Sequence, residues 1–304
     1  MLLSKPTGPK KLSATHAALL RLHKIQARGL FLVTNALLLV LVFYTSHRFP
    51  RKFIRVQGDC DSNWLHVDAL EDNPEIICCD SDVEGGYAGV PCYYGMDLMP
   101  VLGSLKGAWA IPLSALVFNY GAMMLGPNVT MPRVRVYVRR GLLYLGVMAL
   151  RTVVLYMGLG LVEKKLVHLV MGHSENSCWY AELRRGKRCP VEFDHSDHVV
   201  LLVSHYLAIP LFEWFALNVE SAGPCVKRTV LRVWLLLLGG LATYLLFFTA
   251  SYFHTTAENL VGLIIAQACV MTPLLLVTQD YFTSVKWLRL SNFVLQPDDI
   301  KKGN

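Results

Sequence analysis

The chain has 304 residues, of which 54% are hydrophobic and 17% charged, and its mean hydropathy is +0.40. This composition is too apolar for an ordinary soluble domain of this length and favours a membrane protein. The net charge of +7 does not indicate nucleic-acid binding. Lys and Arg lie in short clusters beside apolar runs rather than along one polar face, which is typical of membrane topology signals.

Six apolar stretches are long enough to cross a bilayer core of about 30 Å, which needs roughly 20 residues. The first follows a polar, basic tail at 1–28 and lacks a small-residue cleavage site, so we expect a retained helix rather than a signal peptide. The sequence therefore predicts an all-α, polytopic membrane protein with both termini on one side. The six expected spans are 29–46, 108–125, 141–162, 198–217, 231–253 and 260–279.

Clusters of basic residues predict which side each loop faces. Lys and Arg favour the cytosolic side of short loops, and they are frequent in the N-terminal tail, at 133–140 and at 227–228. Both tails are then cytosolic, and the acid-rich loop 47–107 and the loop 163–197 face the lumen; the basic residues of loop 163–197 run against this trend. The resulting units are a cytosolic tail 1–28, a first span 29–46, a lumenal loop 47–107, a hairpin 108–162, a lumenal loop 163–197, a catalytic core 198–279 and a cytosolic tail 280–304.

Cysteine positions agree with this topology. Disulfides persist on the oxidising side of a membrane, and six of the eight cysteines fall in the two expected lumenal loops, which suits the endoplasmic reticulum. Six cysteines allow 15 pairings, and unpaired thiols are an alternative. Their spacing contains no pair of CxxC knuckles, which argues against zinc. The six are Cys60, Cys78, Cys79, Cys92, Cys178 and Cys189.

Two histidines lie at corresponding ends of consecutive spans. His198 starts the fourth expected span, and His254 follows the fifth. At a rise of about 1.5 Å per residue, helices over 198–220 and 230–254 have similar lengths, and a short turn joins them into a hairpin. We therefore expect both imidazoles at the lumenal boundary, close enough to share one substrate group.

Glu258 lies four residues after His254, at the spacing that brings side chains together on a continuous helix. A carboxylate there fixes the tautomer of the imidazole and stabilises its charged form. The pattern is typical of a histidine that attacks phosphorus or removes a proton while the second histidine protonates the leaving oxygen. The alternative for either histidine alone is a simple anchor at the membrane interface.

The stretches FDHSDHVVLLVSH at 193–205 and YFHTTAENLVG at 252–262 resemble the fat storage-inducing transmembrane family, a distant relative of lipid phosphate phosphatases. Ser196 and His198 match the first signature of that family, in which a glycine stands at the position of Asp197. The second signature has a lysine at the position of Asn259. Its matched residues are Tyr252, Phe253, His254, Glu258 and Gly262.

The resemblance implies an enzyme of the endoplasmic reticulum membrane that cleaves the diphosphate bond of fatty acyl-CoA on the lumenal side and supports lipid droplet formation. It places His254 as nucleophile or base, oriented by Glu258, and His198 as the acid. Ser196 and Asp197 are expected to bind substrate. No cofactor or metal is expected, and the expected partners are fatty acyl-CoA, neutral lipids and bilayer phospholipids, with no nucleic acid.

The phosphate-binding residues of the wider superfamily are not found in this sequence. The wider phosphatase superfamily has a Lys and Arg motif, and an arginine six residues before the second histidine, where this chain has Phe248. Basic residues of the lumenal loop are candidate replacements, although such residues are usually solvated or bound to lipid head groups. These candidates are Lys164, Lys165, Arg184 and Arg185.

Two polar residues inside spans need separate explanations. Arg151 is costly in hydrocarbon and marks a functional or pairing position; we expect Glu213 in the next span to be its partner, either as a structural ion pair or beside a substrate contact. His205 lies two helical turns after His198 on the same face. A hydrogen bond to a neighbouring helix is the favoured interpretation, and an inward extension of the site is the alternative.

Other functions remain open at this stage. A non-enzymatic protein that partitions diacylglycerol or triacylglycerol needs the spans but not two aligned histidines, and a lipid phosphate phosphatase shares the histidines but not the substrate. A metal enzyme built on His195, His198 and His205 needs further ligands. A transporter is disfavoured because no inverted repeat of broken helices is evident.

Overall fold

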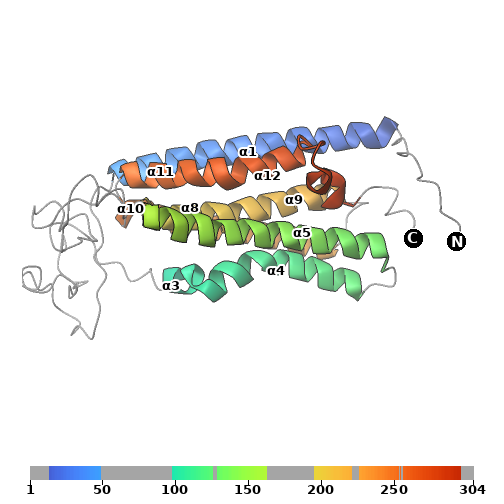
Figure 1. Ribbon diagram of the computed structural model, residues 1–304, viewed down its shortest axis with the longest axis horizontal. Helices are drawn as coiled ribbons and strands as arrows, with labels where there is room; N and C mark the ends of the chain where they lie inside the picture. The colour runs from blue at the N-terminus through green and yellow to red at the C-terminus, as the bar shows by residue number, and fades with distance from the viewer. Residues whose placement is uncertain are drawn as a thin grey trace, which may run out of the picture.

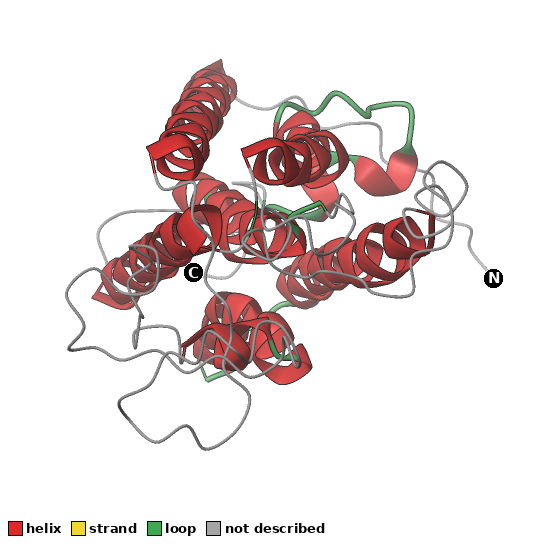
Figure 2. Ribbon diagram, turned by 90° about the vertical axis from the view of Figure 1, so that its left-hand side faces the viewer, coloured by secondary structure: helices red, strands yellow, loops and turns green. Residues whose placement is uncertain are grey.

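The computed structural model describes residues 14–48, 98–125, 129–162, 195–220, 226–252, 254 and 256–295. These residues form helices and contain no strand, so the all-α prediction is confirmed for this part of the chain. The long helices run side by side along one axis (Figure 1). Seen from the end, they gather into a bundle (Figure 2).

Five helical segments are long and apolar enough to cross a membrane, which supports a multi-pass membrane protein. They coincide with five of the six expected spans and extend beyond the apolar runs, because the polar flanking residues continue the helices. The sixth expected span, 108–125, corresponds to α4 (Leu105–Met124), which is not among these five. The five are Ala17–His47, Met131–Val162, Asp197–Val219, Val226–Ser251 and Thr256–Thr278.

Successive long helices run in opposite directions through the bundle (Figure 1). The first half comprises α1 (Ala14–Arg48), α3 (Leu98–Gly103), α4, α5 (Met131–Ala149) and its continuation η3 (Leu150–Gly158). The second half comprises α8 (Asp197–Leu201), η4 (Leu202–Ala208), α9 (Ile209–Val219), α10 (Val226–Tyr252), α11 (Thr256–Ala266), η5 (Gln267–Met271), α12 (Thr272–Thr278), η6 (Lys286–Leu288) and η7 (Leu290–Asn292). The blue start of α1 and the red C-terminal turns lie at the same end of the bundle (Figure 1).

The helix formed by α8, η4 and α9 is the centre of the bundle. Of an 18-residue stretch of this span, 89% is buried inside the protein, compared with 22% to 44% for the other four spans. Because other helices rather than lipid surround it, this helix can hold polar side chains. Ser204, His205 and Glu213 are all fully buried on it.

The expected ion pair between Arg151 and Glu213 is wrong. Glu213 pairs instead with Arg140 of α5, at 2.8 Å, and Arg151 pairs with Asp197. The pairing depends on how far each residue lies along its helix. The helix of α5 and η3 runs antiparallel to the central helix, and Arg151 lies about three turns beyond Arg140 on the helix of α5 and η3. Arg151 therefore faces the beginning of the central helix.

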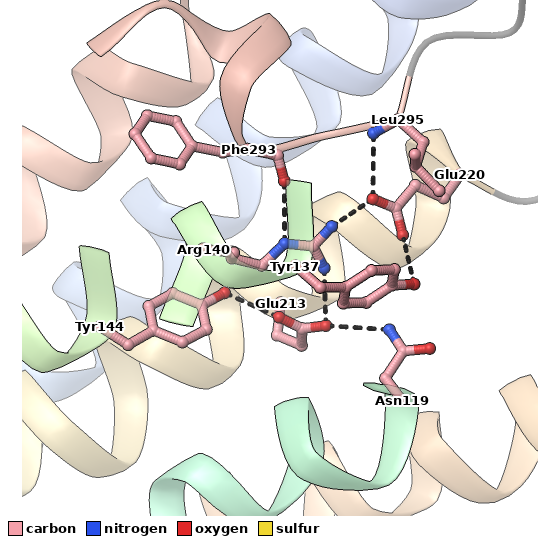
Figure 3. A network of polar contacts seen from close by, with 8 residues as sticks. All are labelled: Asn119, Tyr137, Arg140, Tyr144, Glu213, Glu220, Phe293 and Leu295. Carbon is pink, nitrogen blue, oxygen red and sulfur yellow. Dashed lines mark hydrogen bonds and ion pairs between the residues drawn. The ribbon is translucent and has the colours of Figure 1, made fainter. Parts of the chain in front are cut away.

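Arg140 is the hub of a buried polar network at the end of the bundle that holds the C-terminal turns (Figure 3). Its guanidinium contacts Glu213 and Glu220, and its Nε donates to the Phe293 carbonyl at 2.8 Å. Further donors satisfy the carboxylates, which links α4, α5, α9 and the C-terminal segment. These donors are Asn119 and Tyr144 to Glu213, and Tyr137 and the Leu295 amide to Glu220.

His205 makes the hydrogen bond to a neighbouring helix that its sequence position suggested. Its Nδ1 lies 2.8 Å from the carbonyl oxygen of Ala108 on α4. Pro112 stands four residues after Ala108 and has no N–H to donate to that carbonyl. A carbonyl can only accept, so His205 carries its proton on Nδ1 and replaces the donor missing from α4.

Candidate active site

The two histidines of the expected site lie together at the end of the bundle opposite the Arg140 network. His198 is in the first turn of α8, and His254 lies between the end of α10 and the start of α11. The centroids of their rings are 6.2 Å apart, with the rings tilted by 54°. The proximity expected from the matched helix lengths is therefore observed.

Ser196 fixes the start of the central helix next to α11. Its hydroxyl accepts a hydrogen bond from the Val199 amide at 3.4 Å, which caps α8, and its own amide donates to the Glu258 carbonyl at 3.1 Å. A Cβ on Gly262 would lie 2.6 Å from the Ser196 carbonyl oxygen, so only a glycine permits this approach. Ser196 is fully buried, and its contacts hold the backbone beside His198 in position.

The simplest arrangement of His254 and Glu258 is a continuous helix through both residues. The structure differs, because α10 ends before His254 and α11 begins after it. Nevertheless, His254 Nδ1 lies 3.7 Å from Glu258 Oε2, because Glu258 is in the first turn of α11 and points back across the break. Asn259 supports the break: its amide donates to the carbonyls of His254 at 3.1 Å and of Ala250 at 3.4 Å. The side chain of Glu258 is 3% exposed and that of His254 is 13% exposed.

Arg151 joins this group through Asp197, the residue before His198. Its Nη2 contacts both the carboxylate and, at 3.3 Å, the backbone carbonyl of Asp197. Among the described residues, Arg151 Nε and Asp197 Oδ1 have no hydrogen-bond partner. From the sequence, Arg151 was noted as an intramembrane charge but was not assigned to this site. The feature that could have placed it here is Asp197, an acidic residue at a position where the family signature has glycine.

Several expected residues fall elsewhere. Lys164, Lys165, Arg184 and Arg185 lie outside the described residues, as do the six cysteines of the expected lumenal loops. Phe248 is 3% exposed and packs edge-on against Tyr244 and Phe247, so an apolar ring occupies the position of the superfamily arginine. Within the described part of the chain, no group of three His, Cys, Asp or Glu residues is placed to hold a metal ion.

Comparison with known families identifies the segment that contains His254. Residues 217–273 match the family model of the fat storage-inducing transmembrane protein. This part of the chain is therefore similar to the FIT family. No similar curated protein and no similar solved structure was found.

The FIT match includes His254, Glu258 and Gly262, whereas the segment with Ser196 and His198 precedes it. The contact between Ser196 and Gly262 joins the two segments in space. The FIT match over residues 217–273 and five apolar helices among the described residues together fit a membrane protein in lipid storage.

Proposed function

We propose that this protein belongs to the FIT family and hydrolyses the diphosphate bond of fatty acyl-CoA, producing acyl phosphopantetheine and adenosine 3',5'-bisphosphate. The observation that carries the proposal is the pair of imidazoles 6.2 Å apart, with a buried carboxylate 3.7 Å from one of them. Acid–base and nucleophilic chemistry at phosphorus needs two such groups on opposite sides of the bond that breaks.

In the proposed reaction, His254 acts on the side of attack. Glu258 beside Nδ1 favours the tautomer with the proton on Nδ1, which leaves Nε2 free to attack phosphorus or to remove a proton from water. The bond between phosphorus and the bridging oxygen breaks, and His198 gives its proton to that oxygen as the second phosphate leaves. If His254 attacks directly, water then cleaves the phosphorus–nitrogen bond and restores both histidines.

Arg151 is the described cation best situated to hold a phosphate. It is 7% exposed, it contacts the residue next to His198, and its Nε is available for a further acceptor. Arg pairs with phosphate through parallel N–H donors, which suits a diphosphate that must be fixed before attack. Lys164 and Lys165 remain candidates for a second contact.

The proposed setting is the endoplasmic reticulum membrane, with six spans, both tails cytosolic and the histidines facing the lumen. α4 supports the sixth span, because it is a 20-residue helix that packs against α5, α9 and α10 and lies alongside α5 (Figure 1). The acyl chain would remain in the bilayer while the nucleotide part occupies the lumenal side. Cleavage of acyl-CoA there would support lipid droplet formation and membrane lipid balance.

The direct test is release of adenosine bisphosphate from oleoyl-CoA by the purified full-length protein in detergent with EDTA present. His254→Ala and His198→Ala should each lower kcat by at least about a hundredfold, the range typical of a lost acid–base group. His47→Ala is the matched control, because His47 is an exposed histidine at the C-terminal end of α1, stacked on Phe43. That variant should retain wild-type kcat.

Two results would replace the proposed hydrolysis of acyl-CoA with another function. If neither wild type nor variants turn over oleoyl-CoA while the folded protein binds diacylglycerol or triacylglycerol, a lipid-partitioning role replaces the enzyme. If phosphate is released from phosphatidic acid instead, and both histidines are needed, the protein is a lipid phosphate phosphatase.

A further inference from the structure

A pocket of about 400 Å³ lies at the other end of the bundle, between α5 and the C-terminal turns. It combines basic and apolar side chains, and none of the described residues that line it is acidic. Its lining includes Arg139, Leu142, Leu143, Lys286, Trp287 and Phe293. None of these residues belongs to the histidine site.

The two cations are held on opposite walls by the fold. Arg139 donates from Nη1 to the side-chain oxygen of Asn292, and Asn292 in turn donates to the carbonyls of Lys286 at 2.8 Å and Trp287 at 3.2 Å. Asn292 therefore ties the arginine of α5 to the turn that carries the lysine. An arginine has five N–H donors, so most of those on Arg139 remain for an acceptor in the pocket.

The position of the pocket matches the boundary of a membrane. Arg139 is in the third turn of the span that begins at Met131, and Leu142, one turn further into the span, is 62% exposed. Trp287 is 68% exposed beside it. An indole next to basic residues at the end of a span is typical of the headgroup region, with the apolar helix face toward the acyl chains.

We propose that this pocket binds the headgroup of an anionic phospholipid from the leaflet at this end of the bundle. Its phosphate lies between Arg139 and Lys286, and an acyl chain follows the exposed leucine face of α5. Charge complementarity selects the occupant: two cations, with no carboxylate among the described lining residues, favour an anion, and the apolar wall favours one with a hydrocarbon tail. The lipid then bridges α5 and the C-terminal turns.

The test uses the full-length protein in phosphatidylcholine nanodiscs that contain a minor fraction of phosphatidylserine brominated on its acyl chain. Bromine quenches nearby indoles, and Trp287→Phe isolates the signal of Trp287. We expect stronger quenching by brominated phosphatidylserine than by brominated phosphatidylcholine. Lys286→Gln should weaken the apparent affinity about fivefold, and adding Arg139→Gln should weaken it about fivefold more.

The matched control is Arg135→Gln with Lys227→Gln, two exposed basic residues outside the pocket that change the charge equally. It should retain the preference for phosphatidylserine. Equal quenching by the two brominated lipids, or equal loss in the control, would overturn the proposal. Displacement of the lipid by inorganic phosphate would show that the pocket takes free phosphate instead. Because Lys286 is exposed and only its carbonyl, not its side chain, takes part in the hydrogen bonds that tie the described turn together, Lys286→Gln alone remains informative if Arg139→Gln unfolds.

Discussion

Asp197 is the residue at which this chain differs most consequentially from the FIT signature. A glycine at this position has no carboxylate to pair with Arg151, whereas the side chain of Asp197 binds the guanidinium directly. In the proposed reaction a substrate phosphate must compete with this carboxylate for the same donors. Without substrate, the carboxylate of Asp197 therefore neutralises the charge of Arg151. This ion pair lowers the free-energy cost of burying Arg151 inside the bundle and competes with phosphate binding.

Replacing Asp197 with Asn should release Arg151 for substrate. Because a hydrogen bond to a charged group contributes about 1.5–3 kcal/mol, we expect KM for oleoyl-CoA to fall at least about fivefold, while Arg151→Leu raises it. Initial rates over a range of oleoyl-CoA concentrations measure both effects, and melting in detergent verifies that each variant is folded. An unchanged or higher KM in Asp197→Asn would mean that Asp197 serves the fold rather than competing with phosphate.

At the scale of helices, the sequence predicted the five candidate spans found among the described residues and the meeting of the histidines, because both follow from the lengths of apolar runs. It did not predict partners between helices. The expected pairing of Arg151 with Glu213 was wrong because the lengths of apolar runs do not fix how far two antiparallel helices are shifted along each other, and a shift of a few turns changes which residues meet. The expected spans 231–253 and 260–279 did place a break after α10, but the sequence did not show that Asn259 caps α10 across it.

The bond between His205 and Ala108 gives a prediction about helix pairing. Pro112 leaves the Ala108 carbonyl without a helical donor, and His205 supplies one. His205→Leu should lower stability by about 1–3 kcal/mol, because a buried acceptor becomes unsatisfied. In a Pro112→Ala background the loss should be smaller, since the amide at position 112 then donates to Ala108. Melting temperatures in detergent for the two single variants and the double variant measure the coupling, and equal losses in both backgrounds would contradict it.

For the whole molecule, two polar groups occupy opposite ends of one apolar bundle and differ in how fully they are satisfied. At the Arg140 end, both glutamates receive several donors, and the C-terminal backbone completes the network (Figure 3). At the histidine end, Arg151 Nε and Asp197 Oδ1 have no partner within the described residues. A saturated network is suited to holding helices in register, whereas the unsatisfied atoms at the other end can accept or donate further hydrogen bonds, as the proposed substrate contact requires.

If the Arg140 network sets the register, removing its cation should disturb the distant histidines. Arg140→Met leaves two carboxylates buried without their counterion, and breaking such a pair costs about 3–5 kcal/mol, so we expect a much lower melting temperature and loss of acyl-CoA hydrolysis. The triple variant with Glu213→Gln and Glu220→Gln has no buried charge left in the network and should recover much of the stability.

If the triple variant melts as low as Arg140→Met, the specific hydrogen bonds rather than the unpaired charges hold this end of the bundle together. If Arg140→Met retains the wild-type melting temperature, the network does not set the register.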